Sequence, residues 1–135
     1  MFKTIMVPID LAHLDKLERT LAVASDLAKH FDATVHYVGV TGNTPGSVAH
    51  SPAEFTAKLE DLAATRAKAD NADIRAKTVV SHDPAVELES SLGQAADELN
   101  SDLILMGSHV LGFAEQVFSS HAGYLASHAT RSVFV

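Results

Sequence analysis

Residues 2–40, FKTIMVPIDLAHLDKLERTLAVASDLAKHFDATVHYVGV, carry the pattern that decides the fold. The first part, residues 2–9, is a short apolar run of the kind that forms a strand buried on both faces of a sheet. The apolar spacing then changes to three and four, as in an amphipathic helix, at Leu14, Leu17, Leu21, Ala24 and Ala28. Residues 34–40 are again compact and apolar. The stretch therefore predicts a strand, a helix and a second strand.

The same alternation continues along the chain. A loop rich in Gly and Pro is expected at residues 41–52. The further predicted strands lie at residues 74–80, 102–107 and 131–135, and the further predicted helices at residues 53–69, from Asp83–Pro84 onward, and at 113–128. Parallel strands need helical crossovers, so this order predicts an α/β fold, an open doubly wound sheet of five parallel strands with helices on both faces, similar to a Rossmann fold. We expect one domain over residues 1–135.

Composition excludes several functional classes. Ten Lys and Arg against 17 Asp and Glu give a net charge of −7, which is unsuited to neutralising phosphates along a nucleic acid. The chain has no cysteine, so disulfides, thiolate nucleophiles and Cys-type zinc sites are absent. Its apolar runs are much shorter than the ~20 residues that cross a bilayer. Residues 1–10 do not resemble a secretory signal, and we expect a cytoplasmic protein without membrane insertion.

The fold directs attention to one edge of the sheet. In doubly wound sheets, ligands collect at the carboxyl ends of the strands, near the point where strand order reverses. The side chains to consider therefore follow the predicted strands, at residues 8–10, 40–42, 80–83 and from 106 onward.

Three segments resemble universal stress proteins. They are IMVPID at residues 5–10, DLILMGSH at residues 102–109, and His128–Ala129 with the closing SVFV at residues 132–135. The resemblance implies a five-stranded parallel α/β sheet. It also implies a homodimer in which the last strands of two subunits pair.

Many members of that family bind ATP or another adenine nucleotide through Gly-x-x-Gly, nine residues, and then Gly-Ser or Gly-Thr. Gly107 matches the first glycine, whereas Val110 stands at the second. With one residue deleted, as in some nucleotide-binding members, Ser119 and Ser120 replace the last pair. Glycines there let backbone N–H groups approach phosphate closely, and a β-branched Val110 resists that geometry. The serine hydroxyls can still donate hydrogen bonds to a phosphate.

The resemblance implies a nucleotide site formed by Pro8, Ile9, Asp10, Val40, Met106, Gly107, His109, Val110, Ser119, Ser120 and His121. Asp10 matches the family acid that bonds the adenosine portion, and the plain alternative is that it caps the following helix. Val40 would offer an apolar wall to adenine or is an ordinary strand end. His109 and His121 flank the phosphate loop, where a protonated imidazole donates to an anion, or they are simply solvated. Mg²⁺ would accompany the nucleotide.

Neither a metal centre nor an active site is evident from spacing. The eight histidines include no HExxH or closely spaced ligand pair. There is no GxSxG elbow and no positioned general base. The resemblance implies at most weak ATP hydrolysis or autophosphorylation. The candidate hydroxyl for this activity is that of Ser119 or Ser120.

Two functions remain open at this stage. The first is a stress-response sensor that binds ATP or AMP and changes its contacts with a regulatory protein partner. The second is a dimeric interaction module that needs no nucleotide, which Val110 and Ser119 favour because they alter the phosphate loop. No Lys or Arg lies between Lys77 and Arg131, so we expect the charge that balances a phosphate to come from backbone, histidines or a metal.

Overall fold

The computed structural model describes residues 1–107 and 131–135. Its elements, in chain order, are β1 (Thr4–Pro8), the 3-10 helix η1 (Leu11–Lys16), α1 (Glu18–Phe31), β2 (Thr34–Thr41), α2 (Pro52–Asp70), β3 (Ile74–Val80), α3 (Leu88–Glu98), β4 (Leu103–Leu105) and β5 (Ser132–Phe134). The helix predicted at residues 113–128 lies outside the described residues. The five predicted strands are confirmed, with β1, β4 and β5 shorter than their apolar runs.

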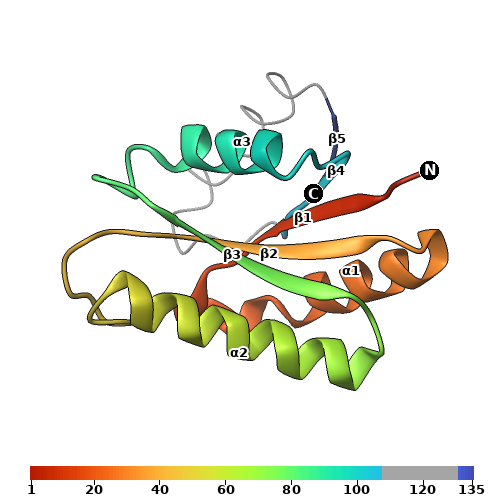
Figure 1. Ribbon diagram of the computed structural model, residues 1–135, viewed down its shortest axis with the longest axis horizontal. Coiled ribbons are helices and arrows are strands. Elements are labelled where there is room, and N and C mark those ends of the chain that lie inside the picture. Colours follow the sequence, from red (N-terminus) through yellow and green to blue (C-terminus); the bar gives the residue numbers. More distant parts are fainter. Residues whose placement is uncertain (108–130) are drawn as a thin grey trace.

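The strands form one sheet in the order β3-β2-β1-β4-β5, and every neighbouring pair is parallel. Figure 1 shows α1 and α2 on one face of this sheet and α3 on the other. The predicted doubly wound α/β fold is therefore confirmed. The chain moves from β1 outward to β3 and then crosses to β4 on the other side of β1. The strand order thus reverses between β1 and β4, which places the expected ligand site at the carboxyl ends of these two strands.

The central strands supply the most deeply buried part of the core. Ile5, Met6 and Val7 of β1 are inaccessible to solvent, as are Leu103 and Ile104 of β4. A strand covered on both faces has no polar side to present, which explains why these runs do not alternate. No helix within the described ranges has the length and hydropathy to cross a membrane.

The start of the first helical segment differs from the sequence prediction. Residues 11–16 form η1, and His13 within it has non-helical backbone angles. A 3-10 turn has three residues per turn instead of 3.6, so the apolar stripe changes direction there. Leu14, predicted on the buried face, is therefore exposed, whereas Leu17, Leu21, Ala24 and Ala28 are buried as predicted.

Candidate functional site

Asp10 follows β1 and begins η1. One carboxylate oxygen accepts from the backbone N–H of Ala12 at 3.0 Å, and the other lies 2.8 Å from Nδ1 of His13. The capping role considered for Asp10 is thus present, although the helix it caps is η1 and not α1. Each carboxylate oxygen has a second lone pair. Asp10 can therefore cap the turn and still accept a hydrogen bond from a ligand.

A pocket of about 670 Å³ opens beside Asp10. This volume lies within the range of about 300–1,000 Å³ that is usual for small-molecule sites. Its walls are mostly apolar and come from β1, β2, α2, α3 and the loop after β2; they include Pro8, Ile9, Asp10, Leu11, Val38, Val40, Phe55, His82, Pro84, Leu88 and Leu92. The structure therefore brings together Pro8, Ile9, Asp10 and Val40, four of the residues predicted for the nucleotide site.

The loop at residues 42–49 forms one side of this pocket. The N–H of Gly46 donates to the carbonyl of Ala49 at 2.9 Å, and the ammonium of Lys58 bonds the carbonyl of Val48. Immediately after it, α2 begins with a capping box. The Ser51 hydroxyl accepts from the N–H of Glu54 at 3.1 Å, and the Glu54 carboxylate accepts from the N–H of His50 at 3.1 Å. These bonds fasten the loop to α2.

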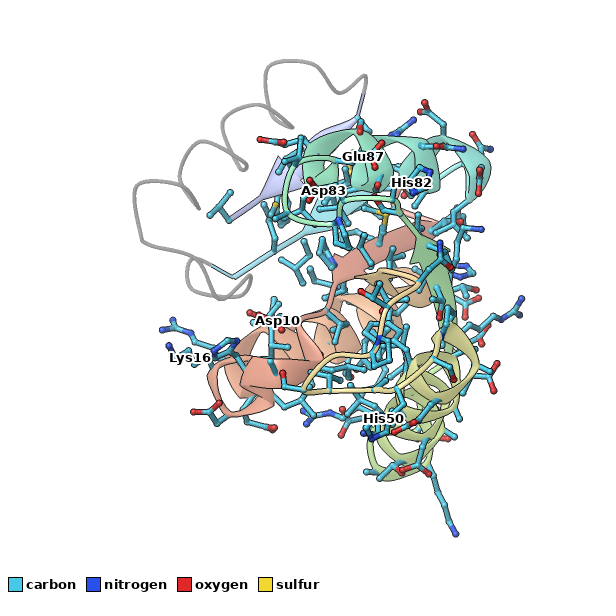
Figure 2. All side chains as sticks on the ribbon, turned by 90° about the vertical axis from the view of Figure 1, so that its left-hand side faces the viewer. Asp10, Lys16, His50, His82, Asp83 and Glu87 are labelled. Carbon is cyan, nitrogen blue, oxygen red and sulfur yellow. The ribbon has the colours of Figure 1, made fainter. Side chains whose placement is uncertain are left out.

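The turn before α3 forms the opposite side of the pocket. The helix predicted to start at Asp83–Pro84 begins at Leu88 instead. Asp83 caps only a local turn, accepting from the N–H of Val86 at 3.3 Å. Glu87 holds this turn, because its carboxylate accepts from the Ser81 hydroxyl at 2.8 Å and from the N–H of Asp83 at 3.0 Å. These two bonds, the hydroxyl first, lower the pKa of Glu87. Figure 2 shows His82, Asp83 and Glu87 grouped on this turn, across from Asp10.

Met106 and Gly107, also predicted for the site, line a second pocket. Its other walls come from the end of η1, the start of α1 and the end of the chain at Phe134 and Val135, and they carry Lys16 and Arg19. The sequence prediction placed no basic side chain near Gly107, because it considered only residues close to it in the chain. In the fold, Lys16 and Arg19 line the same pocket as Gly107. No local sequence pattern predicts that Lys16 and Arg19 lie near Gly107, because their position depends on the order of the strands in the sheet.

The remaining predicted site residues, His109, Val110, Ser119, Ser120 and His121, lie outside the described residues. The residues that sequence reasoning missed in the first pocket are chiefly those of the loop, together with Leu11, Phe55, Leu88 and Leu92. Their common signal is a position at the carboxyl edge or on the helix turn that covers it.

The comparison with protein families is decisive. The model of the universal stress protein family matches residues 1–135. The chain belongs to this family. Among curated universal stress proteins, it is 27% identical over 146 residues to universal stress protein G of Salmonella typhimurium, covering 100% of this chain and 99% of the relative.

Solved universal stress protein structures share the fold. One from Burkholderia pseudomallei superposes with a TM-score of 0.69 at 22% identity, covering 98% of this chain and 93% of that one. One from Archaeoglobus fulgidus, in complex with dAMP, gives a TM-score of 0.69 at 20% identity, with 98% and 95% covered. A universal stress protein in complex with cAMP gives 0.68 at 20% identity, with the same coverage of both chains. At these identities the likeness concerns the fold.

Proposed function

We propose that the pocket beside Asp10 binds an adenine nucleotide, ATP or AMP, and that the protein acts as a stress-response sensor. The observation that carries this proposal is the placement of the Asp10 carboxylate on the wall of a mostly apolar pocket, next to Pro8, Ile9 and Val40. Apolar walls suit the faces of a purine, and a carboxylate accepts hydrogen bonds from ribose hydroxyls. The proteins whose structures contain dAMP or cAMP have the same fold, which supports the choice of nucleotide.

Magnesium would enter with the phosphates. Among residues 1–107 and 131–135, no group of three His, Asp or Glu side chains is placed to hold a metal ion. Mg²⁺ commonly binds through substrate phosphates with few protein ligands, so it would share its site with the nucleotide.

The sensor role assigns no chemistry to the protein. Nucleotide binding would shift the contacts of the protein with a regulatory partner, in proportion to the difference in affinity between the two states. The homodimer, the partner and the cytoplasmic location stay predictions, as do weak ATP hydrolysis and autophosphorylation at Ser119 or Ser120.

Asp10→Asn tests the proposal. The amide oxygen can still accept from the N–H of Ala12, so the cap on η1 is kept while the charged acceptor is lost. Hydrogen bonds to charged groups contribute about 1.5–3 kcal/mol, so we expect ATP and AMP to bind about 10- to 100-fold more weakly by isothermal titration calorimetry. Asp61→Asn, an exposed change on α2 away from the pocket, is the control.

The same titrations decide between the sensor and the interaction module that Val110 favours. A wild-type dimer that ignores millimolar ATP and AMP would contradict the sensor and support the module. Equal affinities for the wild type and Asp10→Asn would remove Asp10 from the site.

A further inference from the structure

The second pocket lies at the carboxyl end of β4, on the side of the sheet that α1 covers. Three of its lining residues, Arg19, Thr20 and Val23, share one face of α1, and Lys16 joins them from the end of η1. The ends of β4 and β5 supply the opposite wall with Met106, Gly107 and Phe134. Two cations and a hydroxyl therefore face the backbone just after a strand, which is where α/β proteins bind ligands.

Neither cation forms an ion pair within residues 1–107 and 131–135. Arg66, Arg75 and Arg131 each form an ion pair with a carboxylate, whereas Arg19 pairs with none of the described residues. The same is true of Lys16. Glu18, which lies between them in sequence, is bound to Arg66 at 2.8 Å. Among the described residues, the pocket therefore holds two basic side chains that pair with no carboxylate, although the whole chain carries a net charge of −7.

The Thr20 hydroxyl adds a further hydrogen-bonding group to the pocket. Thr20 is only 8% exposed and lines the pocket, yet its hydroxyl has no hydrogen-bond partner among the described residues. Its oxygen is not among the fully buried unpartnered atoms, so it is accessible from the pocket and can bond water or a ligand. A hydroxyl, the Lys16 ammonium and the Arg19 guanidinium are all donors that suit an oxygen-rich anion.

The pocket is also within reach of the first one. Asp10 caps the start of η1 and Lys16 is its last residue, so one short element connects the two pockets. Strands β1 and β4 are paired, so their ends are neighbours at the spacing of about 4.8 Å between strands. Figure 2 shows Asp10 and Lys16 on the same side of the molecule, apart from His82, Asp83 and Glu87.

We infer that Lys16, Arg19 and Thr20 form a phosphate-binding site beside Gly107, which takes the phosphate chain of the nucleotide whose base lies in the first pocket. The route between the two pockets rests on the proposed function, whereas the anion site does not. This site supplies the positive charge that the segment between Lys77 and Arg131 lacks. It also explains how phosphate can be held where Val110 replaces a glycine.

The test is a titration of the full chain with ATP, adenosine and inorganic tripolyphosphate. The variant Lys16→Gln/Arg19→Gln is compared with Lys29→Gln/Lys68→Gln, which changes the net charge equally at two exposed lysines outside the pocket. We expect the first variant to bind ATP and tripolyphosphate at least about 10-fold more weakly than the wild type does. Its affinity for adenosine should be unchanged. The control variant Lys29→Gln/Lys68→Gln should bind ATP and tripolyphosphate with nearly the wild-type affinities.

Thr20 is tested with a matched pair of substitutions. Thr20→Val removes the hydroxyl at nearly constant shape, so ATP should bind about 2- to 10-fold more weakly. Thr20→Ser keeps the hydroxyl, so most of the wild-type affinity for ATP should remain. Adenosine should bind equally to both. Equal ATP affinities of the two variants would remove Thr20 from the site.

The outcomes separate this inference from the proposed function. Loss of tripolyphosphate binding in Lys16→Gln/Arg19→Gln, without any adenosine binding to the wild type, would support the anion site and contradict the adenine pocket. Unchanged ATP and tripolyphosphate affinities in that variant, or an equal loss in the control pair, would overturn the anion site. Adenosine that binds as tightly as ATP would overturn it as well.

Discussion

Asp70, at the end of α2, connects the two helices that cover one face of the sheet. One of its oxygens accepts from the Ser25 hydroxyl at 2.6 Å and from Nε of Arg66 at 2.6 Å. Arg66 also reaches Glu18 of α1 at 2.8 Å. Beneath them, Tyr37 of β2 is fully buried with its hydroxyl unpartnered among the described residues, and this burial raises its pKa to about 12. The ionised carboxylate of Asp70 connects α1 and α2, because it accepts from Ser25 of α1 and from Arg66 of α2.

This geometry predicts a pH-dependent contribution to stability. The Ser25 hydroxyl first, and then Arg66, lower the pKa of Asp70 in the folded protein. A lowered folded-state pKa means that the stabilisation is complete above the unfolded value of about 3.9 and is lost as the pH falls through the folded value. We therefore expect Asp70→Asn to lower Tm clearly at pH 7 and to differ much less from the wild type near pH 3.

Thermal unfolding followed by circular dichroism at the two pH values provides the measurement. Asp61→Asn, on the exposed side of the same helix, should follow the wild type at both. A Tm difference for Asp70→Asn that is the same at pH 7 and near pH 3 would show that the charge of Asp70 is not what stabilises the contact.

Helix α2 packs closely on β2 because one position of the strand has no side chain. A Cβ atom at Gly39 would lie 2.5 Å from Cε1 of Phe55 and 3.3 Å from a methyl group of Leu59. The Phe55 ring also lines the first pocket. Gly39 therefore determines how near α2 and the pocket wall come to the sheet.

Gly39→Ala should destabilise the protein by about 1–3 kcal/mol, because the packed ring must move. Chemical denaturation measures the loss, and adding Phe55→Leu should recover part of it, since the smaller side chain leaves room for the methyl group. Gly93→Ala is the matched control. Gly93 lies in α3 with open space where the Cβ would be, so the substitution should be neutral or stabilising. Equal losses at both glycines would contradict the packing argument.

The elements differ in how well the sequence predicts them. β2 and β3 begin and end within one residue of their predicted bounds, because buried strands are continuous apolar runs. The predicted start of α3 was wrong by four residues, since Asp83 and Pro84 satisfy the rules for a helix start equally well in an isolated turn. Asp10 and Val40, predicted for the site from the resemblance and from their places at strand ends, line the first pocket, whereas the placement of Lys16 and Arg19 depends on strand order, which local patterns do not encode.

At the scale of the whole molecule, β5 forms one of the two edges of the sheet, and β3 forms the other. Figure 1 shows β5 beyond β4 at that edge, and no strand of the described residues pairs with its outer side. The carbonyl of Phe134 accepts from the N–H of Met106, so the backbone of Phe134 faces β4. Adjacent residues of a strand present their N–H and C=O groups to opposite sides, and Val133 therefore presents its own to the open edge. An unpaired edge of this kind favours pairing with another chain.

This edge predicts that the protein is a homodimer in which two β5 strands pair. Val133→Pro removes the N–H that faces outward, while the bonds of Phe134 to β4 remain. We expect the variant to sediment as a monomer in analytical ultracentrifugation at concentrations where the wild type is a dimer. Val133→Thr keeps both the N–H and the β-branched shape, so it should remain dimeric. A dimeric Val133→Pro variant would move the interface elsewhere, and a monomeric wild type would contradict the dimer itself.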